Sequence, residues 1–582
     1  MSGLLSADHS GYSTPLTAPQ TPGLLEDHNG IFFTPRRAMM SFENLVALAN
    51  HQERLKEARK MVWRNRGEPV VELNSLEECL RHALLGGFRS GTLAFTIRAC
   101  VNIVLALIRM HRVPREQRLA LIRHAIFGSS TFQFAAMLGS FTSLYKFLIN
   151  ALPILIPAMN PRQTTSSRSA SALDDEDTDL LTLHVPDASA ISGSRRKERL
   201  SLSKRAQELL VRKQTRRWHA ALAGGIAGGL AIMWEARSRR AVISQQMFVR
   251  GLQGSYNAYT TKRNIKVPHG DVLVFSLACA QILYGFLLRP ETLPRSYNTW
   301  IQQASKVPPE CVRMNNSLVR NGTFNVDDLD RITKLKEITS ANRTDLFDLR
   351  TAFLQPSKDG SDYFPRYAPC SAVHPALSAC TAVPLDRFFS VFKWMLPIYG
   401  ALHFVPAVVF RRKAFTQDPG KVLVKAGVGS LRSSAFLGVF VVIYQTLFCS
   451  KHNLHEYLSL LRKGRFPSSI LANTLLAQIP QWIIDLLVSK GSFAALGLAS
   501  GLSLFVEEKR RRGELAMYVL PKGLESAWVM ARGKGWVFRT GKWGETILTS
   551  LGMAMVMSTY QNDPQHLSGL VRRMLYQFIG PN

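Results

Sequence analysis

Cysteine is sparse in this sequence, and its spacing argues against two kinds of site. The 582 residues include seven cysteines, an odd number, and no two of them form a CxxC pair. Disulfide-built domains use an even set of cysteines, and structural zinc sites usually draw on closely spaced cysteine or histidine pairs. The pattern indicates neither a disulfide framework nor a zinc site. We therefore expect no metal and no cofactor.

Signatures of catalysis are also absent from the sequence. It contains no GxSxG nucleophile elbow, no Walker phosphate loop and no dinucleotide-binding fingerprint after a predicted strand. His452 and His455 stand three positions apart, without the HExxH order of a zinc hydrolase. We therefore predict that the protein is not an enzyme, and we assign no catalytic residue.

Acidic residues are few compared with basic ones. The chain has 41 Asp and Glu against 72 Lys and Arg, a formal net charge of +31. Such an excess can serve nucleic-acid binding, but here the basic residues gather at the ends of long apolar segments and in the loops between them. Lipid headgroups explain that placement more simply. We expect a lipid bilayer as partner and no nucleic acid.

The first forty residues lack the apolar core of a cleaved secretory signal and are rich in Pro, Ser and Thr. Too little apolar surface is available there to offset the entropy of ordering. We predict that residues 1–75 form a disordered Pro/Thr-rich tail followed by an amphipathic helix at 41–75. This region is where we expect protein partners to bind, and the pattern leaves the oligomeric state open.

Long apolar segments dominate the rest of the chain. Several are long enough to cross about 30 Å of hydrocarbon at about 1.5 Å per residue, which predicts a polytopic membrane protein. The segments lie near 82–109, 124–157, 218–234, 272–289, 388–410, 426–449, 470–489, 491–506 and 544–560.

One apolar segment occurs twice. Ala223–Tyr256 and Ala495–Trp528 share ten identities over thirty-four ungapped positions, at a spacing of 272. A second pair, 136–148 and 435–447, shares six identities in thirteen at a spacing of 299. These matches predict an internal duplication.

Extending the two spacings gives each half four apolar segments. An even number returns the chain to its starting side, so we expect two similarly oriented four-helix units, about eight transmembrane helices, related by an axis along the membrane normal. Segment 470–489 is a re-entrant or interfacial helix, or a ninth span. The predicted units are 1–75, a first membrane repeat at 76–290 with a disordered insert at 161–200, a polar Cys-containing linker at 291–387, and a second repeat at 388–582.

Paired small residues mark the duplicated segments. GxxxG spacing removes side-chain bulk and lets a neighbouring helix backbone approach closely, although a pore or groove lined by backbone would use the same residues. The predicted helix-packing residues are Gly224, Gly225, Gly228, Gly229, Gly497 and Gly501.

Charged residues within or beside the apolar segments form a second candidate set. A charge in hydrocarbon is costly and normally faces protein, water or headgroups. Snorkelling or an interhelical ion pair would explain such residues, and a solute pathway is the alternative. The candidates are Arg89, Arg98, Glu235, Arg432 and Glu507.

Several segments resemble the transmembrane protein 135 family, a peroxisomal membrane protein family related to the inner-membrane import translocase superfamily. The resemblance rests on RHALLGGFRSGTLAF, WHAALAGGIAGGLAIMWE, AQILYGFLLRPETLPRSY and MVMSTYQNDPQHLSGLV, and on Cys370, His374 and Cys380 in APCSAVHPALSACTAVPLDRF. It implies residence in the peroxisomal or mitochondrial membrane, and roles in organelle dynamics and lipid or fatty-acid metabolism.

The expected function is that of a multi-pass organelle membrane protein, peroxisomal by this resemblance. It would act by permeation, membrane shaping or partner recruitment. The alternative is a solute channel, transporter or translocase-like component of the mitochondrial membrane.

Overall fold

The computed structural model describes residues 73, 75–110, 114–156, 216–265, 267–355, 366–410, 412–462, 479–538 and 540–580. The predicted N-terminal tail, the amphipathic helix at 41–75 and the insert at 161–200 thus fall outside the described residues, apart from Leu73 and Ser75.

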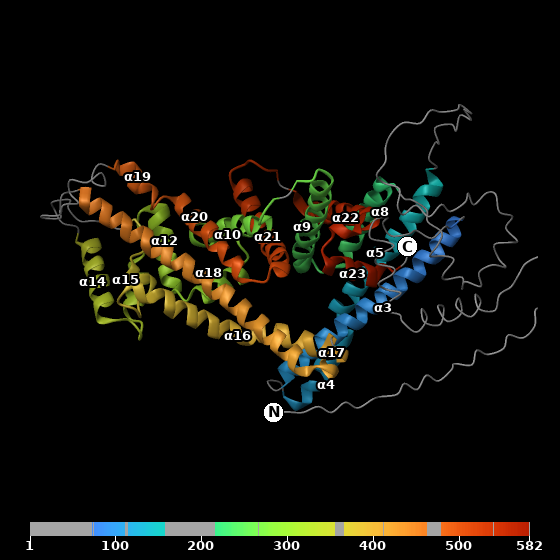
Figure 1. Cartoon of the computed structure of the whole chain (residues 1–582), viewed down its shortest axis with the longest axis horizontal. Helices are drawn as coiled ribbons and strands as arrows, with labels where there is room; N and C mark the ends of the chain where they lie inside the picture. Colours follow the sequence, from blue (N-terminus) through green and yellow to red (C-terminus); the bar gives the residue numbers. More distant parts are fainter. Residues whose placement is uncertain are drawn as a thin grey trace, which may run out of the picture. The chain divides into compact units, whose positions relative to one another are not determined.

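Every regular element in the described residues is helical, and no strand occurs among them (Figure 1). The first group of helices is α3 (Leu76–Arg109), α4 (Arg118–Phe127), α5 (Ser129–Leu155), α8 (Arg217–Ala231), α9 (Arg237–Lys262), α10 (Gly270–Leu288) and α11 (Arg295–Ser305). A middle group is α12 (Pro309–Asn321), α13 (Val326–Thr333), α14 (Ser340–Leu354) and α15 (Cys370–Val373). The last group is α16 (Val383–Phe410), α17 (Arg412–Gln417), α18 (Pro419–Arg462), α19 (Gln481–Leu486), α20 (Lys490–Ser500), α21 (Lys509–Gly533), α22 (Gly544–Asn562) and α23 (Gly569–Ile579).

Helix length and hydropathy establish a membrane protein. Five helical stretches are long and apolar enough to cross a bilayer: Leu76–Leu107, Arg118–Leu155, Gly270–Leu288, Cys380–Val408 and Pro419–Arg462. The apolar stretch Lys490–Val506 is shorter. The predicted all-α, multi-pass membrane fold is confirmed. The expected number of eight spans stays a prediction. In segment 470–489, for which the sequence left several placements open, the described part contains only the short helix α19 after Pro480.

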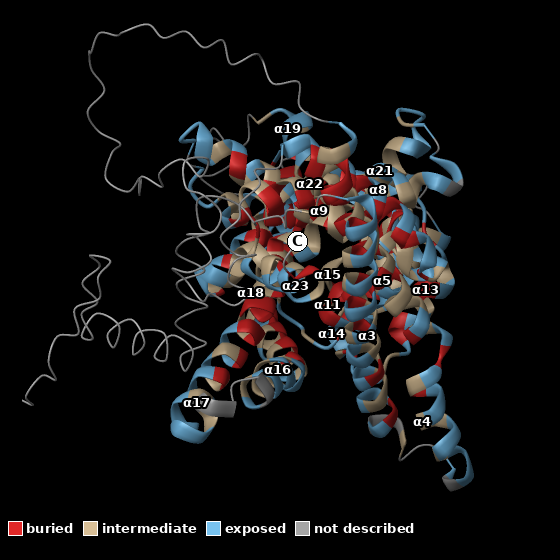
Figure 2. Cartoon of the chain, turned by 90° about the vertical axis from the view of Figure 1, so that its right-hand side faces the viewer, coloured by how far each residue is buried: buried red, intermediate tan, exposed pale blue. Residues whose placement is uncertain are grey.

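Many residues along the candidate spans are exposed (Figure 2), and large apolar residues are among them. Phe88 on α3 is 75% exposed and Leu402 on α16 is 62% exposed. Exposed apolar surface of this extent is compatible with contact with lipid tails. The lipid bilayer is thus the environment that these helix faces fit.

The duplicated segment adopts the same local structure in both copies. In the first, α8 tightens into a 3-10 turn, η3 (Ile232–Trp234), before α9 begins at Arg237. In the second, α20 tightens into η8 (Gly501–Val506) before α21 begins at Lys509. Each break lies at a glutamate, Glu235 or Glu507, with extended backbone angles of φ −77°, ψ 153° and φ −78°, ψ 156°.

The helices that follow are also related, although their sequences have diverged. α10 and α22 begin at 270 and 544, and α11 and α23 begin at 295 and 569, so both pairs are 274 positions apart. A 3-10 turn joins the successive helices in each copy: η4 (Pro290–Thr292) lies between α10 and α11, and η10 (Pro564–His566) lies between α22 and α23. The duplication therefore continues past the region of recognisable identity.

Packing crosses the predicted repeat boundary. α22, from the second half, packs on α8 and α9 of the first, and α10 packs on α20 and α21 of the second. α3 packs with α5, and α16 with α18, within their own halves; Figure 1 shows the latter two side by side. The two halves have thus exchanged α10 and α22, the helices that follow the helix break and α9 or α21, as protomers exchange elements in domain swapping.

The six predicted packing glycines line these exchanged contacts. A Cβ on Gly225 would lie 3.4 Å from Ala554 Cβ, and one on Gly497 would lie 2.8 Å from Ala280 Cα. An added Cβ on each of the remaining four would also contact α22 or α10: Gly224 and Gly228 lie against Met557 and Met553, Gly229 against Ser550, and Gly501 against Ser276. In both copies the small residues let α22 or α10 approach the broken helix closely.

The described part of the region between the halves is folded into helices. Its helices α12 to α15 contribute a buried cluster that packs on α10, α18 and α20, and its members include Met314, Leu318, Leu329, Ile332 and Leu346. The described residues of 291–387 therefore hold a small apolar core against α10, α18 and α20.

Candidate functional site

Each helix break is closed by an arginine five positions after its glutamate. Arg512 donates from Nε to the Glu507 carbonyl at 3.0 Å and from Nη2 to the Phe505 carbonyl at 2.8 Å. In the first copy, Arg240 makes the same two bonds, to Glu235 at 2.7 Å and Met233 at 2.6 Å. A break in a helix leaves backbone carbonyls without their intrahelical partners, and each guanidinium group donates to two of them.

Both glutamate side chains are buried and face an arginine one helical turn ahead. Glu507 Oε1 lies 3.1 Å from Arg511 Nη1, and Glu235 Oε1 lies 2.5 Å from Arg239 Nη2. The glutamates are 2% and 1% exposed. A buried carboxylate is stable only when paired and hydrogen-bonded, so each glutamate requires its arginine.

The second copy adds polar partners around its ion pair. Ser433 on α18 donates to Glu507 Oε2 at 2.9 Å. Arg511 donates from Nη1 to Ser433 Oγ at 2.9 Å and to His403 Nε2 on α16 at 2.8 Å. Because Nε2 accepts from a guanidinium, His403 is neutral with its proton on Nδ1. Three elements therefore meet at one hydrogen-bonded cluster.

A cavity of about 310 Å³ opens beside this cluster. We call it the Glu507 cavity, and its lining is Lys425, Val428, Gly429, Arg432, Glu507, Glu508 and Arg511. Three of these side chains are cationic and two are anionic, so the lining carries one positive charge in excess.

The predicted membrane charges separate into different environments. Arg432 and Glu507 line the same cavity, whereas Glu235 pairs with Arg239. Arg89 lines a separate cavity of about 450 Å³ and donates to the Gln577 carbonyl at 3.5 Å. Arg98 is half-buried, and its Nε atom has no hydrogen-bond partner among the described residues.

A group that sequence reasoning missed lies in the middle region. The ligand atoms of Cys370, His374, Cys380 and Cys449 all lie within 4.8 Å of one another. The resemblance drew attention to three of these residues, but Cys449 lies sixty-nine positions beyond Cys380 on α18. Sequence spacing alone therefore does not predict that Cys449 lies beside the other three residues.

Comparisons with protein-family models, with curated proteins and with solved structures find no match for this chain.

Proposed function

We propose that this protein is a multi-pass peroxisomal membrane protein that acts in lipid or fatty-acid metabolism by binding and passing anionic amphiphiles. The observation that supports the proposal is the Glu507 cavity. Glu507 is already neutralised by Arg511, so Lys425 and Arg432 remain against Glu508 alone. An excess cation beside lipid-facing helices favours an anionic headgroup or carboxylate whose acyl chain lies in the bilayer.

A comparison of the two copies supports a specialised role for the second. At the spacing of 299, Gln133 stands where the second copy has Arg432, and Phe134 stands where it has Ser433. The first copy thus keeps the broken helix and its ion pair without the added cation and hydroxyl. The two copies share a backbone but differ in these side chains. This difference fits a structural role for the first copy and a binding role for the second.

Binding is tested with a photoreactive palmitate on purified protein in detergent micelles. We expect the double variant Lys425→Gln/Arg432→Gln to label about tenfold less, equivalent to about 1.4 kcal/mol of binding free energy. Glu508→Gln should label more, because it removes negative charge from the lining. The control is Arg510→Gln. Arg510 lies on α21, near the cavity residues Glu508 and Arg511 in sequence, but its side chain is exposed and is not part of the cavity lining. Equal labelling of all four proteins would reject the cavity as the binding site.

Passage across the bilayer is tested separately with a fluorescent long-chain acyl-coenzyme A in proteoliposomes, because its phosphates prevent unaided crossing. Uptake that depends on Arg432 supports permeation. Binding without uptake would instead favour presentation of the lipid to a partner.

The peroxisomal assignment rests on the sequence resemblance and is tested by a fluorescent tag imaged with peroxisomal and mitochondrial markers. Overlap with the peroxisomal marker supports it. Overlap with the mitochondrial marker would favour the alternative, a channel or translocase-like component of the mitochondrial membrane.

A further inference from the structure

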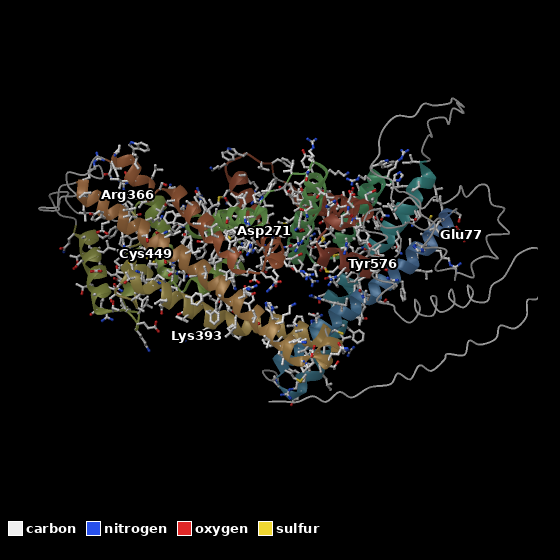
Figure 3. The ribbon with its side chains drawn as sticks, in the orientation of Figure 1. Glu77, Asp271, Arg366, Lys393, Cys449 and Tyr576 are labelled. Carbon is white, nitrogen blue, oxygen red and sulfur yellow. The ribbon has the colours of Figure 1, made fainter. Side chains whose placement is uncertain are left out.

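Three thiols and one imidazole converge between the middle region and α18. Cys370 begins α15, His374 caps its C-terminal end, and Cys380 begins the 3-10 turn η5 (Cys380–Ala382). Cys449 comes from α18, and Figure 3 labels it there. All three cysteines are free thiols, Cys449 and His374 are 3% and 2% exposed, and His374 Nε2 lies 3.4 Å from Cys380 Sγ.

The imidazole is held in the orientation that a metal ligand needs. His374 Nδ1 lies 3.0 Å from the Leu377 carbonyl and donates to it, which turns Nε2 toward the sulfur atoms. Metal-ligating histidines characteristically donate their other ring N–H to a carbonyl or carboxylate. The side chain is therefore positioned for coordination before any ion binds.

The loop that carries His374 is itself braced from α14. Asn342 Nδ2 donates to the carbonyls of Pro375 and Leu377, each at 2.9 Å, and Asn342 is 4% exposed. On the other side, Asn453 Nδ2 donates to Cys380 Sγ at 3.7 Å. These bonds fix both the backbone behind the histidine and one of the sulfur atoms.

We propose that Cys370, His374, Cys380 and Cys449 bind one zinc ion in a closed, four-coordinate structural site. Tetrahedral coordination with Zn–S near 2.3 Å and Zn–N near 2.0–2.1 Å places the donor atoms about 3.5–3.8 Å apart. The donors already lie within 4.8 Å of one another, so small side-chain movements complete the tetrahedron. A two-iron cluster divides its ligands between two metal atoms and requires a wider set.

Such an ion would join the middle region to a membrane helix. Three of its ligands come from residues 370–380 and the fourth from α18, so coordination closes a loop that includes all of α16. Cys449 also lies sixteen residues along α18 from Ser433, about 24 Å at about 1.5 Å per residue. The metal site is therefore separate from the Glu507 cavity, and the inference does not depend on the proposed function.

Metal content of the full-length protein, purified in detergent without chelator, is the first test. We expect about one zinc per chain in the unaltered protein and less than a tenth of that in Cys449→Ser and His374→Ala. Cys311→Ser removes a buried thiol of the same region outside the group and should keep its zinc. Unaltered protein without zinc that also takes up none when zinc is added, or protein that carries iron and sulfide, overturns the proposal.

Thiol reactivity of the unaltered protein is the second test, and it needs no variant to fold. With zinc bound, Cys370 and Cys380 should alkylate at least tenfold more slowly than they do after a zinc chelator has removed the ion. Replacement of zinc by Co²⁺ should give the absorption of a tetrahedral thiolate site. A disulfide among Cys370, Cys380 and Cys449, or no change in reactivity on chelation, would refute the metal site.

Discussion

Glu235 and Glu507 occupy the same backbone position in two copies of one broken helix, and each is followed by an arginine that pairs with its carboxylate and by another that bonds the carbonyls of the break. The two glutamates nevertheless differ in what surrounds them. Glu507 accepts a hydrogen bond from Ser433 and borders a cavity, whereas Glu235 Oε1 accepts from the Ala236 backbone amide at 2.8 Å. A shared scaffold thus carries two different chemical environments.

The arginines that close the breaks should stabilise the fold in both copies. Arg512→Ala or Arg240→Ala leaves two carbonyls without their donors, which costs roughly 1–3 kcal/mol for each variant. The expected result is a lower Tm by a similar amount in the two variants, measured by thermal unfolding in detergent. Arg510→Ala, an exposed neighbour on α21, should leave Tm unchanged. A loss of stability in only one copy would contradict equivalent breaks.

Close approach of α10 to η8 should make Gly501 intolerant of any side chain. A Cβ there would meet Ser276 Cα at 2.4 Å, a backbone contact that a rotamer change does not relieve. Gly501→Ala should therefore destabilise the protein by roughly 1–3 kcal/mol. Gly491→Ala is the matched control on α20, since its nearest neighbour is Ser489 Oγ at 3.9 Å. Equal Tm values for the two variants would show that the helices are farther apart.

The exchange of helices between halves predicts which cysteine pair will cross-link. A Cβ on Gly225 would lie 3.4 Å from Ala554 Cβ, close to the separation that a disulfide requires. Gly225→Cys/Ala554→Cys should oxidise within one chain, seen by non-reducing peptide mapping. Without the exchange, Gly225 would face Ala280 instead, so Gly225→Cys/Ala280→Cys is the opposing pair. A disulfide in that second pair alone would show that each half keeps its own helix.

Asp485 on α19 should stabilise the protein in a pH-dependent way. Partial burial acts to raise its pKa, but hydrogen bonds from Gln481 and His455 and the charge of Arg366 outweigh it, so the pKa of Asp485 is lowered. A lowered folded pKa contributes stability that is present above the unfolded pKa, about 3.9, and is lost as pH falls through the folded value.

Asp485→Asn should therefore lower Tm at neutral pH and converge with the unaltered protein below about pH 4. Asp418→Asn provides the comparison, because the one salt bridge that Asp418 makes among the described residues is an exposed pair with Lys421. A difference between Asp485→Asn and the unaltered protein that stays constant down to pH 2 would rule out this ionisation as its cause.

Local pattern made much of this architecture predictable. Apolar segments of membrane length became helices, and the identities around Glu235 and Glu507 reflected a shared break because the same residues follow at the same spacing. The paired glycines met neighbouring helices, as GxxxG spacing indicates. These features depend on residues close in sequence, so composition and spacing suffice to predict them.

The sequence did not predict in the same way which helices pack against each other. α10 and α22 present equivalent small residues, Ser276 and Ala280 in one and Ser550 and Ala554 in the other, so either could pack on either broken helix. The sequence accordingly predicted four-helix units without indicating the exchange. Cys449 joined Cys370, His374 and Cys380 for a related reason, since its position is fixed by how α18 packs on the middle region.

By itself, the sequence determined that this protein is a helical membrane protein with an internal duplication, because hydropathy and repeat spacing are local properties of the chain. Tertiary structure alone decided which half supplies each packing helix, which charges share a cavity and which thiols meet a histidine. Those outcomes depend on contacts between residues far apart in sequence, and chemically similar surfaces leave them open until the chain folds.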